Sequence, residues 1–248
     1  MHHEFRDEIM KAVFSLRFDA PESEARRLRA VAEEMFDEIR RLESLLSRFI
    51  EDSDVAQINR LSNGESVVVA PETFHCLELA EEATQLTDGY FDVAYLSSSV
   101  DGTERPFSLL TKPHRVRSEV ESLQIDLGGI GKGFALDHVK PTPLSYGYSR
   151  VLLCADSSTM LALAPPENEP GWEVLVDEHR QALSNKAVSC SGTSIRGEHV
   201  FDVKRRVWAS QSKRCWIFAL TAALADAFST AALTMTAEEI DRLRRSTG

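Results

Sequence analysis

The stretch Asp126-Leu127-Gly128-Gly129-Ile130-Gly131-Lys132-Gly133 carries four of the twelve glycines of the chain within six residues. An apolar segment precedes it, and a helical segment that contains Asp137 follows directly. Glycines between a strand and a helix let backbone amides approach a phosphate closely, and Lys132 adds a positive charge beside the start of the helix. The stretch therefore predicts a turn that binds a diphosphate. It fits neither the Walker pattern nor the Gly-x-Gly-x-x-Gly pattern, so a glycine-rich turn without a ligand is the alternative.

A second segment near the C-terminus points to a metal. Ala225-Asp226-Ala227-Phe228-Ser229-Thr230-Ala231 lies in an alanine-rich stretch that predicts a helix, so Asp226 and Thr230 are one turn apart on the same face. A carboxylate and a hydroxyl in this arrangement are hard oxygen ligands, which suit a Mg2+ ion that substrate phosphates also hold. The alternative is a solvated or capping Asp226 beside a Thr230 that only packs.

The composition is typical of a compact protein. With 248 residues and 43% hydrophobic content, the chain can bury a core as one large domain or as two intimate lobes. The formal net charge of -11 argues against a nucleic-acid partner, because phosphate-binding surfaces need a basic face. No apolar run approaches the roughly 18 to 20 residues of a membrane span, so we expect no membrane insertion. The N-terminus has no hydrophobic signal core and no cysteine for a lipid anchor, which favours a cytoplasmic location.

Hydrophobic periodicity predicts an α+β fold, in which an antiparallel sheet is flanked by helices. The longest helix is expected to open at 21–23, and its core stripe is Leu28, Val31, Met35, Ile39, Leu42, Leu46 and Phe49. Further helices are expected over 71–86 and 221–235 and, capped by Thr236, at the C-terminus. The segment 97–117, with its glycine and prolines, predicts loops. Strands are expected at 12–18, 67–69, 151–154, 160–164, 172–176, 187–189, 200–203 and 216–219.

Six motifs, in order along nearly the whole chain, resemble those of the ApbE-type flavin transferases. They are Ser47-Arg48-Phe49 with the following Asp52-Ser53-Asp54-Val55 and Ile58-Asn59-Arg60-Leu61, Thr87-Asp88-Gly89-Tyr90-Phe91-Asp92, the glycine run, Ser191-Gly192, His199-Val200-Phe201-Asp202, and Ala225 to Thr230. Six matches in order are far more specific than any one of them. The resemblance implies a single ApbE-like domain over residues 1–248.

The chain also departs from the family pattern at several positions. A G-G-D motif is expected near Ser157-Ser158-Thr159, where both glycines and the acid are missing. Cys190 replaces the threonine of T-S-G, and Val203 replaces a proline after Asp202. These changes affect the part of the site that faces the acceptor more than the part that holds the metal and the diphosphate.

The resemblance implies the activity of an FAD:protein FMN transferase, with Mg2+ as cofactor and FAD as substrate. A threonine hydroxyl of an acceptor protein attacks the phosphorus on the FMN side of FAD, and AMP leaves. Such a displacement depends mainly on positioning and on charge neutralisation.

By this resemblance, Mg2+ is held by Asp226, Thr230 and the backbone carbonyl of Gly129. His199 is the only histidine in a family motif, and it is a candidate, beside Asp226, for a catalytic role. At a strand start, however, a histidine is more often structural. The remaining histidines show no metal-ligand spacing. The residues implied in FAD binding are Met10, Tyr90, Phe91, Asp92, Lys132, Asp137 and His199. The alternatives are core packing for Met10, a turn acid for Asp92 and a helix-surface acid for Asp137.

Two other functions use the same metal half of the site. One is a flavin-binding protein that has lost transfer to an acceptor. The other is a Mg2+-dependent hydrolase that splits FAD to FMN and AMP with water as the acceptor.

Overall fold

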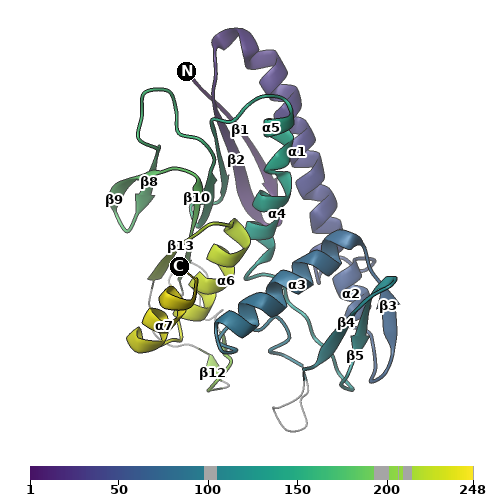
Figure 1. Cartoon of the computed structure of the whole chain (residues 1–248). Helices are drawn as coiled ribbons and strands as arrows, with labels where there is room; N and C mark the ends of the chain where they lie inside the picture. Colours follow the sequence, from purple (N-terminus) through teal and green to yellow (C-terminus); the bar gives the residue numbers. More distant parts are fainter. Residues whose placement is uncertain (98–104, 193–200, 206, 209–213, 248) are drawn as a thin grey trace.

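The computed structural model describes residues 1–97, 105–192, 201–205, 207–208 and 214–247. Its centre is a six-stranded sheet of strand order β1-β2-β6-β7-β10-β13, in which every neighbouring pair is antiparallel (Figure 1). The prediction of an α+β fold with an antiparallel sheet is therefore confirmed. The strands are β1 (His2–Ile9), β2 (Ala12–Asp19), β6 (Val151–Ala155), β7 (Thr159–Ala162), β10 (Lys186–Gly192) and β13 (Arg214–Ala219).

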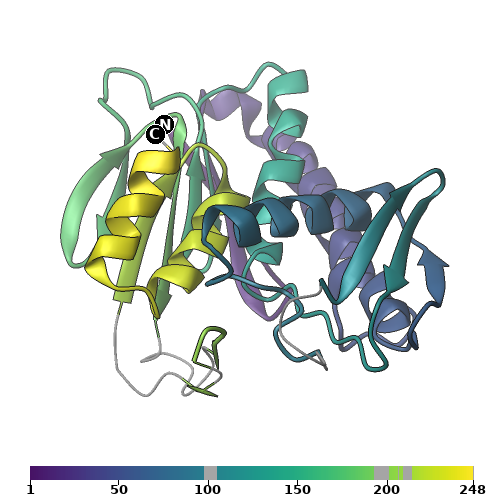
Figure 2. The same ribbon diagram turned by 60° about the horizontal axis from the view of Figure 1, so that its bottom comes forward.

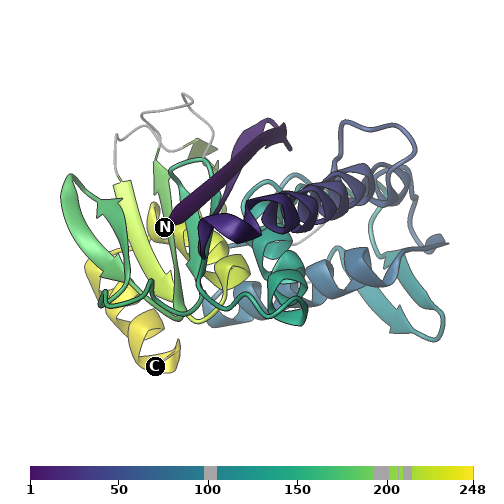
Figure 3. The same ribbon diagram turned by 90° about the horizontal axis from the view of Figure 1, so that it is seen from above.

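Helices cover one face of this sheet. α6 (Ala222–Ala232) packs on β10 and β13, α4 (Gly131–Val139) packs on β6 and β7, and α1 (Ala25–Leu46) lies beside β1 (Figure 3). The helices α4 and α6 also pack on each other. Since α4 begins inside the glycine run and α6 carries Asp226, this packing brings together two segments that lie far apart in the sequence.

The long helix α1 confirms the predicted core stripe except at its end. Leu28, Met35 and Leu46 are buried, as are the other predicted positions inside the helix. Phe49, in contrast, is 70% exposed. The helix ends at Leu46 and Ser47 is extended, so the periodicity no longer applies at residue 49.

The prediction of loops over 97–117 is wrong for its second half. β4 (Phe107–Thr111) and β5 (His114–Ser118) form a hairpin, and β3 (Ser66–Val68) adds to it as a three-stranded sheet. The proline at 113 lies in the tight turn between the strands and does not break them. Figure 2 shows this small sheet beside α3 (Pro71–Leu86), which also contacts α6 and α7 (Ala237–Thr247).

Two predicted strands do not belong to the main sheet. β8 (Trp172–Val176) pairs with β9 (His179–Leu183), and β11 (Phe201–Asp202) pairs with β12 (Val207–Trp208). The β8–β9 hairpin packs on the face of the sheet opposite the helices, where Trp172, Val174 and Val176 join the buried side chains of β6, β7 and β10. Their alternation thus reflects burial against the sheet and not pairing within it. The strand β1 was not predicted at all.

The remaining helices are short. α2 (Asp54–Ile58) begins at Ser53, whose side chain accepts from the backbone N–H of Ala56, and α5 (Pro141–Ser145) follows α4. α7 begins after Thr236, as predicted, because Glu239 accepts from both the backbone N–H and the hydroxyl of Thr236. Among the described residues, no helix is both long and apolar enough to cross a bilayer.

Candidate functional site

The glycine run fits against α6 so closely that one of its members has no room for a side chain. A Cβ on Gly133 would lie 2.1 Å from the carbonyl oxygen of Ala222 and 2.8 Å from the Cα of Ala223. The backbone N–H of Gly133 donates to Asp226 Oδ2 at 3.2 Å. Glycine at this position therefore lets the start of α4 reach the carboxylate on α6.

Asp137 holds the same two helices together from the other end. Its two carboxylate oxygens accept from the backbone N–H groups of Ala222, at 3.0 Å, and Ala223, at 2.8 Å. Burial raises the pKa of Asp137, although these two hydrogen bonds oppose the rise. Asp137 caps the N-terminus of α6 and does not line the cleft described below. Its role in binding FAD stays a prediction.

Asp226 is almost fully buried, at 3% exposed, and each of its oxygens has its own partners. Oδ1 accepts from the hydroxyls of Thr159, at 3.3 Å, and Ser189, at 3.2 Å. Oδ2 faces the glycine run, where Lys132 Nζ lies 3.9 Å away. A buried carboxylate is costly unless it is hydrogen-bonded or paired, and these contacts supply both.

Thr230 meets the glycine run at a second point. A Cβ on Gly129 would lie 3.2 Å from Thr230 Oγ1 and 3.1 Å from Phe91 Cε2. A side chain at this position would have to push the Thr230 or Phe91 side chain away by a few tenths of an ångström, so glycine favours the close approach of the backbone to the hydroxyl. A carboxylate, a hydroxyl and a backbone segment thus converge at one place, and hard oxygen donors of this kind fit Mg2+. We call Gly129, Lys132, Asp226 and Thr230 the Asp226 site.

The Asp226 site lies at the wall of a cleft of about 1550 Å³. This volume exceeds the roughly 300–1000 Å³ of most small-molecule pockets, so the cleft has room for a dinucleotide and part of a second partner. Gly129, Lys132 and Thr230 line it, whereas Asp226 lies behind them. The cleft continues past the turn between β6 and β7 onto the sheet face below the β8–β9 hairpin.

The predicted residues Tyr90, Phe91 and Asp92 also line the cleft. The hydroxyl of Tyr90 donates to Glu239 at 2.7 Å, which ties this wall to α7. Asp92 accepts from the backbone N–H of Ala94 at 2.8 Å, and burial raises its pKa. Tyr90 therefore offers its ring and Asp92 a half-buried carboxyl group to a ligand, whereas Phe91 is only 5% exposed and belongs to the core.

Other cleft residues were given no role by sequence reasoning. Lys11 Nζ lies 4.5 Å, and the Arg48 guanidinium carbon 4.8 Å, from the centre of the exposed Phe49 ring. Arg48 also lies 3.5 Å from Asp126 of the glycine run. The Ser-Arg-Phe motif was the available signal, but nothing in it shows that Lys11 arrives from the β1–β2 turn.

Besides Asp137 and Asp226, two further predicted residues are not among the residues that line the cleft. Met10 lies next to Lys11 in a left-handed backbone conformation (φ 54°) and packs against the main core, outside the lining of the cleft. Its contact with flavin stays a prediction. His199 lies outside the described residues. Asp202, the last residue of the same motif, is buried and accepts from the guanidinium of Arg205 at 2.7 Å.

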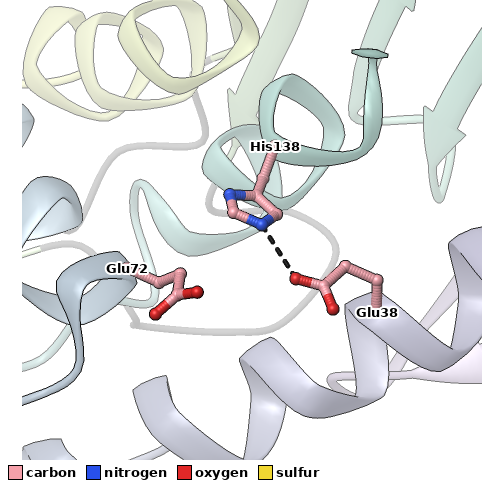
Figure 4. A group of neighbouring side chains, drawn as sticks. All are labelled: Glu38, Glu72 and His138. Atoms are coloured by element: carbon pink, nitrogen blue, oxygen red, sulfur yellow. Dashed lines mark hydrogen bonds and ion pairs between the residues drawn. The ribbon is translucent and has the colours of Figure 1, made fainter. Parts of the chain in front are cut away.

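A second group of possible metal ligands lies apart from the cleft, between α1, α3 and α4 (Figure 4). Ligand atoms of Glu38, Glu72 and His138 all lie within 4.8 Å of one another, and His138 Nε2 lies 2.8 Å from Glu38 Oε1. Arg41 donates to Glu38 at 2.7 Å and to Glu72 at 2.6 Å. We call these four residues the Arg41 cluster.

The carboxylates of the Arg41 cluster already share a cationic partner, Arg41. Hydrogen bonds from Arg41 and then from His138 lower the pKa of Glu38 against the effect of burial. Burial is the largest influence on the pKa of Glu72 and would raise it, but the hydrogen bond from Arg41, a backbone hydrogen bond and the nearby positive charge together lower the pKa. The guanidinium thus supplies the positive charge that a metal would otherwise bring.

The ApbE family model matches residues 10–248. No curated protein matches the chain. Among solved structures, the apo flavinyl transferase ApbE of Pseudomonas stutzeri is 18% identical with a TM-score of 0.83, and the alignment covers 99% of this chain and 88% of that chain. An ApbE protein of Thermotoga maritima is 23% identical, with a TM-score of 0.79 and coverages of 98% and 90%. For the flavin transferase ApbE of Vibrio cholerae the identity is 14%, the TM-score 0.78 and the coverages 98% and 90%. At these identities the likeness shows a shared fold.

Proposed function

The chain belongs to the ApbE family, and on that basis we propose that it transfers FMN from FAD to a threonine hydroxyl of an acceptor protein, with Mg2+ as cofactor and AMP as the second product. The observation that carries the proposal is the convergence of Gly129, Asp226 and Thr230 at the wall of a large cleft. Two segments that the sequence separates by almost a hundred residues meet there with the donor atoms that Mg2+ prefers.

In this proposal the glycine run holds the diphosphate of FAD. Backbone N–H groups at the start of α4 and the ammonium of Lys132 present positive charge to the phosphate oxygens. Asp226 Oδ2, Thr230 Oγ1 and the backbone of Gly129 would hold Mg2+. When bound, Mg2+ neutralises charge on the diphosphate and on the leaving phosphate.

Lys132 has a double role in this arrangement. In the structure its ammonium lies 3.9 Å from Asp226 Oδ2 and is the cation beside that carboxylate. A metal at Asp226 would release the lysine toward the phosphate oxygens of FAD. The side chain is long and flexible, so this movement needs no change in the backbone.

The transfer step is an in-line displacement at phosphorus. A bond forms between the threonine oxygen of the acceptor and the FMN phosphorus, and the bond from that phosphorus to the bridging oxygen breaks, so this oxygen leaves with AMP. The threonine proton passes to a base, for which His199 is the candidate by family motif. The ring of Tyr90 would support a flat part of FAD by stacking, and the buried Phe91 would support the glycine run from behind.

A hydrolase or a flavin-binding protein is the second candidate, and the location of the family departures favours it. Ser157, Ser158, Cys190 and Val203 all line the same cleft as the Asp226 site. The changed positions are therefore those that an acceptor segment would meet. With the acceptor excluded, water would take the place of the threonine hydroxyl.

The test is to incubate the purified protein with FAD and Mg2+, with and without a threonine-bearing peptide of the family's acceptor type. AMP is measured by chromatography, and the peptide by mass spectrometry. The proposal expects AMP together with a peptide that has gained the mass of FMN minus water. AMP with an unmodified peptide would favour the hydrolase, and FAD binding without AMP would favour the flavin-binding protein.

A further inference from the structure

We propose that Thr159 and Ser189 are positioning residues that orient the carboxylate of Asp226 toward the metal. The inference rests on the proposed function, because it concerns the same site. Thr159 lies in the segment where the family has G-G-D and does not match it, and Ser189 lies in none of the matched motifs. Neither residue lines the cleft. Their role follows from contacts made behind it.

Thr159 and Ser189 lie directly opposite each other on the neighbouring strands β7 and β10. Both side chains are fully buried, and their hydroxyl oxygens are 3.0 Å apart. Both hydroxyls point at the same oxygen, Asp226 Oδ1. Since the strands are central in the sheet, this pair of donors is fixed by rigid elements.

These contacts give the two carboxylate oxygens of Asp226 different partners. Oδ1 is occupied by the two hydroxyls, whereas Oδ2 is directed at the N–H of Gly133 and the ammonium of Lys132. Rotation of the carboxylate would break the hydrogen bonds at Oδ1. The pair therefore holds Oδ2 on the side of the glycine run, where the metal would bind.

The same strand connects to the second proposed ligand. The hydroxyl oxygen of Ser229 lies 3.4 Å from that of Ser189 and 2.8 Å from that of Ser191. The hydroxyl oxygen of Ser191 in turn lies 3.2 Å from Thr230 Oγ1. Ser229 also donates to the backbone carbonyl of Asp226 at 2.9 Å. Side chains of β10 thus contact both Asp226 and Thr230, so the distance between the two ligand atoms is set by the sheet as well as by α6.

The test measures metal binding and not turnover. Mn2+ serves as the probe for the Mg2+ site, and its affinity in the presence of FAD is measured by water proton relaxation. The variants are Thr159→Val, which keeps the shape of the side chain and removes the hydroxyl, Ser189→Ala, and Thr159→Ser, which restores the hydroxyl. Ser118→Ala is the matched control, because Ser118 is also a fully buried strand hydroxyl but bonds only within its own hairpin region.

We expect Thr159→Val and Ser189→Ala each to weaken Mn2+ binding by about 10- to 100-fold, the usual effect of losing a partner of a metal ligand. Thr159→Ser and Ser118→Ala should bind Mn2+ like the parent protein. Parent-like binding by both Thr159→Val and Ser189→Ala would overturn the inference. Asp226→Asn separates this failure from that of the proposed function. If Asp226→Asn also binds Mn2+ like the parent protein, the assignment of the metal site is wrong. If Asp226→Asn loses Mn2+ while Thr159→Val and Ser189→Ala keep it, only the positioning role is wrong.

Discussion

The Asp226 site and the Arg41 cluster both bring metal-binding groups together, yet they differ in the cation that lies beside their carboxylates. In the Arg41 cluster two carboxylates and a histidine meet from three helices (Figure 4). The guanidinium of Arg41 donates to both carboxylates. At the Asp226 site a single carboxylate is buried, hydroxyls hold one of its oxygens, and the other faces a flexible lysine at the wall of a cleft. The ligand atoms of the cluster lie within 4.8 Å of one another, but of the two groups it is the Asp226 site whose cation lies at the cleft and can move to a ligand there.

The largest expected effect comes from removing the close approach that builds the Asp226 site. In Gly133→Ala the new Cβ would lie 2.1 Å from a backbone oxygen of α6, so α4 and α6 must separate. We expect a loss of more than about 3 kcal/mol in the free energy of unfolding, the upper end for overpacking. Urea denaturation measures it.

Gly131→Ala is the control for that prediction. Its nearest atom would be Leu127 Cβ at 4.0 Å, an ordinary contact, and alanine favours the first turn of α4. This variant should be as stable as the parent or slightly more stable. Equal destabilisation by both substitutions would mean that the close contact of α4 with α6 is not what holds the site.

Asp226→Asn removes the charge and keeps the shape. We expect AMP release from FAD in the presence of Mg2+ to fall by more than about 100-fold, since losing a ligand should cost more than losing a partner of a ligand. Glu72→Gln, which changes the Arg41 cluster instead, should leave the rate unchanged. A large loss in Glu72→Gln with little loss in Asp226→Asn would reverse the assignment of the two regions.

The third prediction concerns metal binding by the Arg41 cluster once its guanidinium is removed. Arg41→Ala removes the guanidinium from between Glu38 and Glu72, and a histidine with two carboxylates is a suitable set for Zn2+. Calorimetry should show saturable Zn2+ binding in Arg41→Ala and none at this cluster in the parent. Adding His138→Ala to the variant should abolish the binding. If the parent binds Zn2+ and loses it in His138→Ala alone, Arg41 does not block the cluster.

The smallest expected effect is a difference in pH dependence between Glu38 of the Arg41 cluster and Asp137, which joins α4 to α6 beside the Asp226 site. Glu38 has its pKa lowered from 4.5 by Arg41 and His138, so its contribution to stability is present above that value and is lost as the pH falls through the lowered pKa. Asp137 has its pKa raised from 3.8 by burial, so its contribution is fully present below that value and is lost as the pH rises through the raised pKa. The melting temperature of each variant relative to the parent, followed against pH, tests these signs.

For Glu38→Gln the deficit should be greatest near neutral pH and shrink in acid, and it should stay below about 1 kcal/mol because the pair is partly exposed. For Asp137→Asn the deficit should instead shrink as the pH rises from acid. Parallel pH profiles for the two variants would contradict the opposite pKa shifts.

Local patterns in the sequence were sufficient to predict each of the two segments that form the Asp226 site. The one-turn spacing of Asp226 and Thr230 is set by the helix alone, and the glycine run marks the start of α4. What the sequence could not supply is the packing of α4 on α6, because nothing local states that Gly133 meets Ala222. The family resemblance supplied the link that periodicity could not.

The failures have the same physical origin. Thr159 and Ser189 lie opposite each other only through the β7–β10 register, and each alone is an ordinary strand residue. The β8 strand was placed in the main sheet because alternation tells which side chains are buried, not which strand is the neighbour. The sequence around His138 has no metal-ligand spacing, because Glu38 and Glu72 lie on two other helices and meet His138 only in the fold.

The most direct test of the account is to locate the metal. Crystals grown with FAD and Mn2+ would be examined by anomalous diffraction at the manganese absorption edge. We predict a peak bound by Asp226 and Thr230 beside Gly129, with the diphosphate of FAD on the glycine run. A peak at Glu38, Glu72 and His138, or FAD bound with no metal beside Asp226, would contradict the central claim.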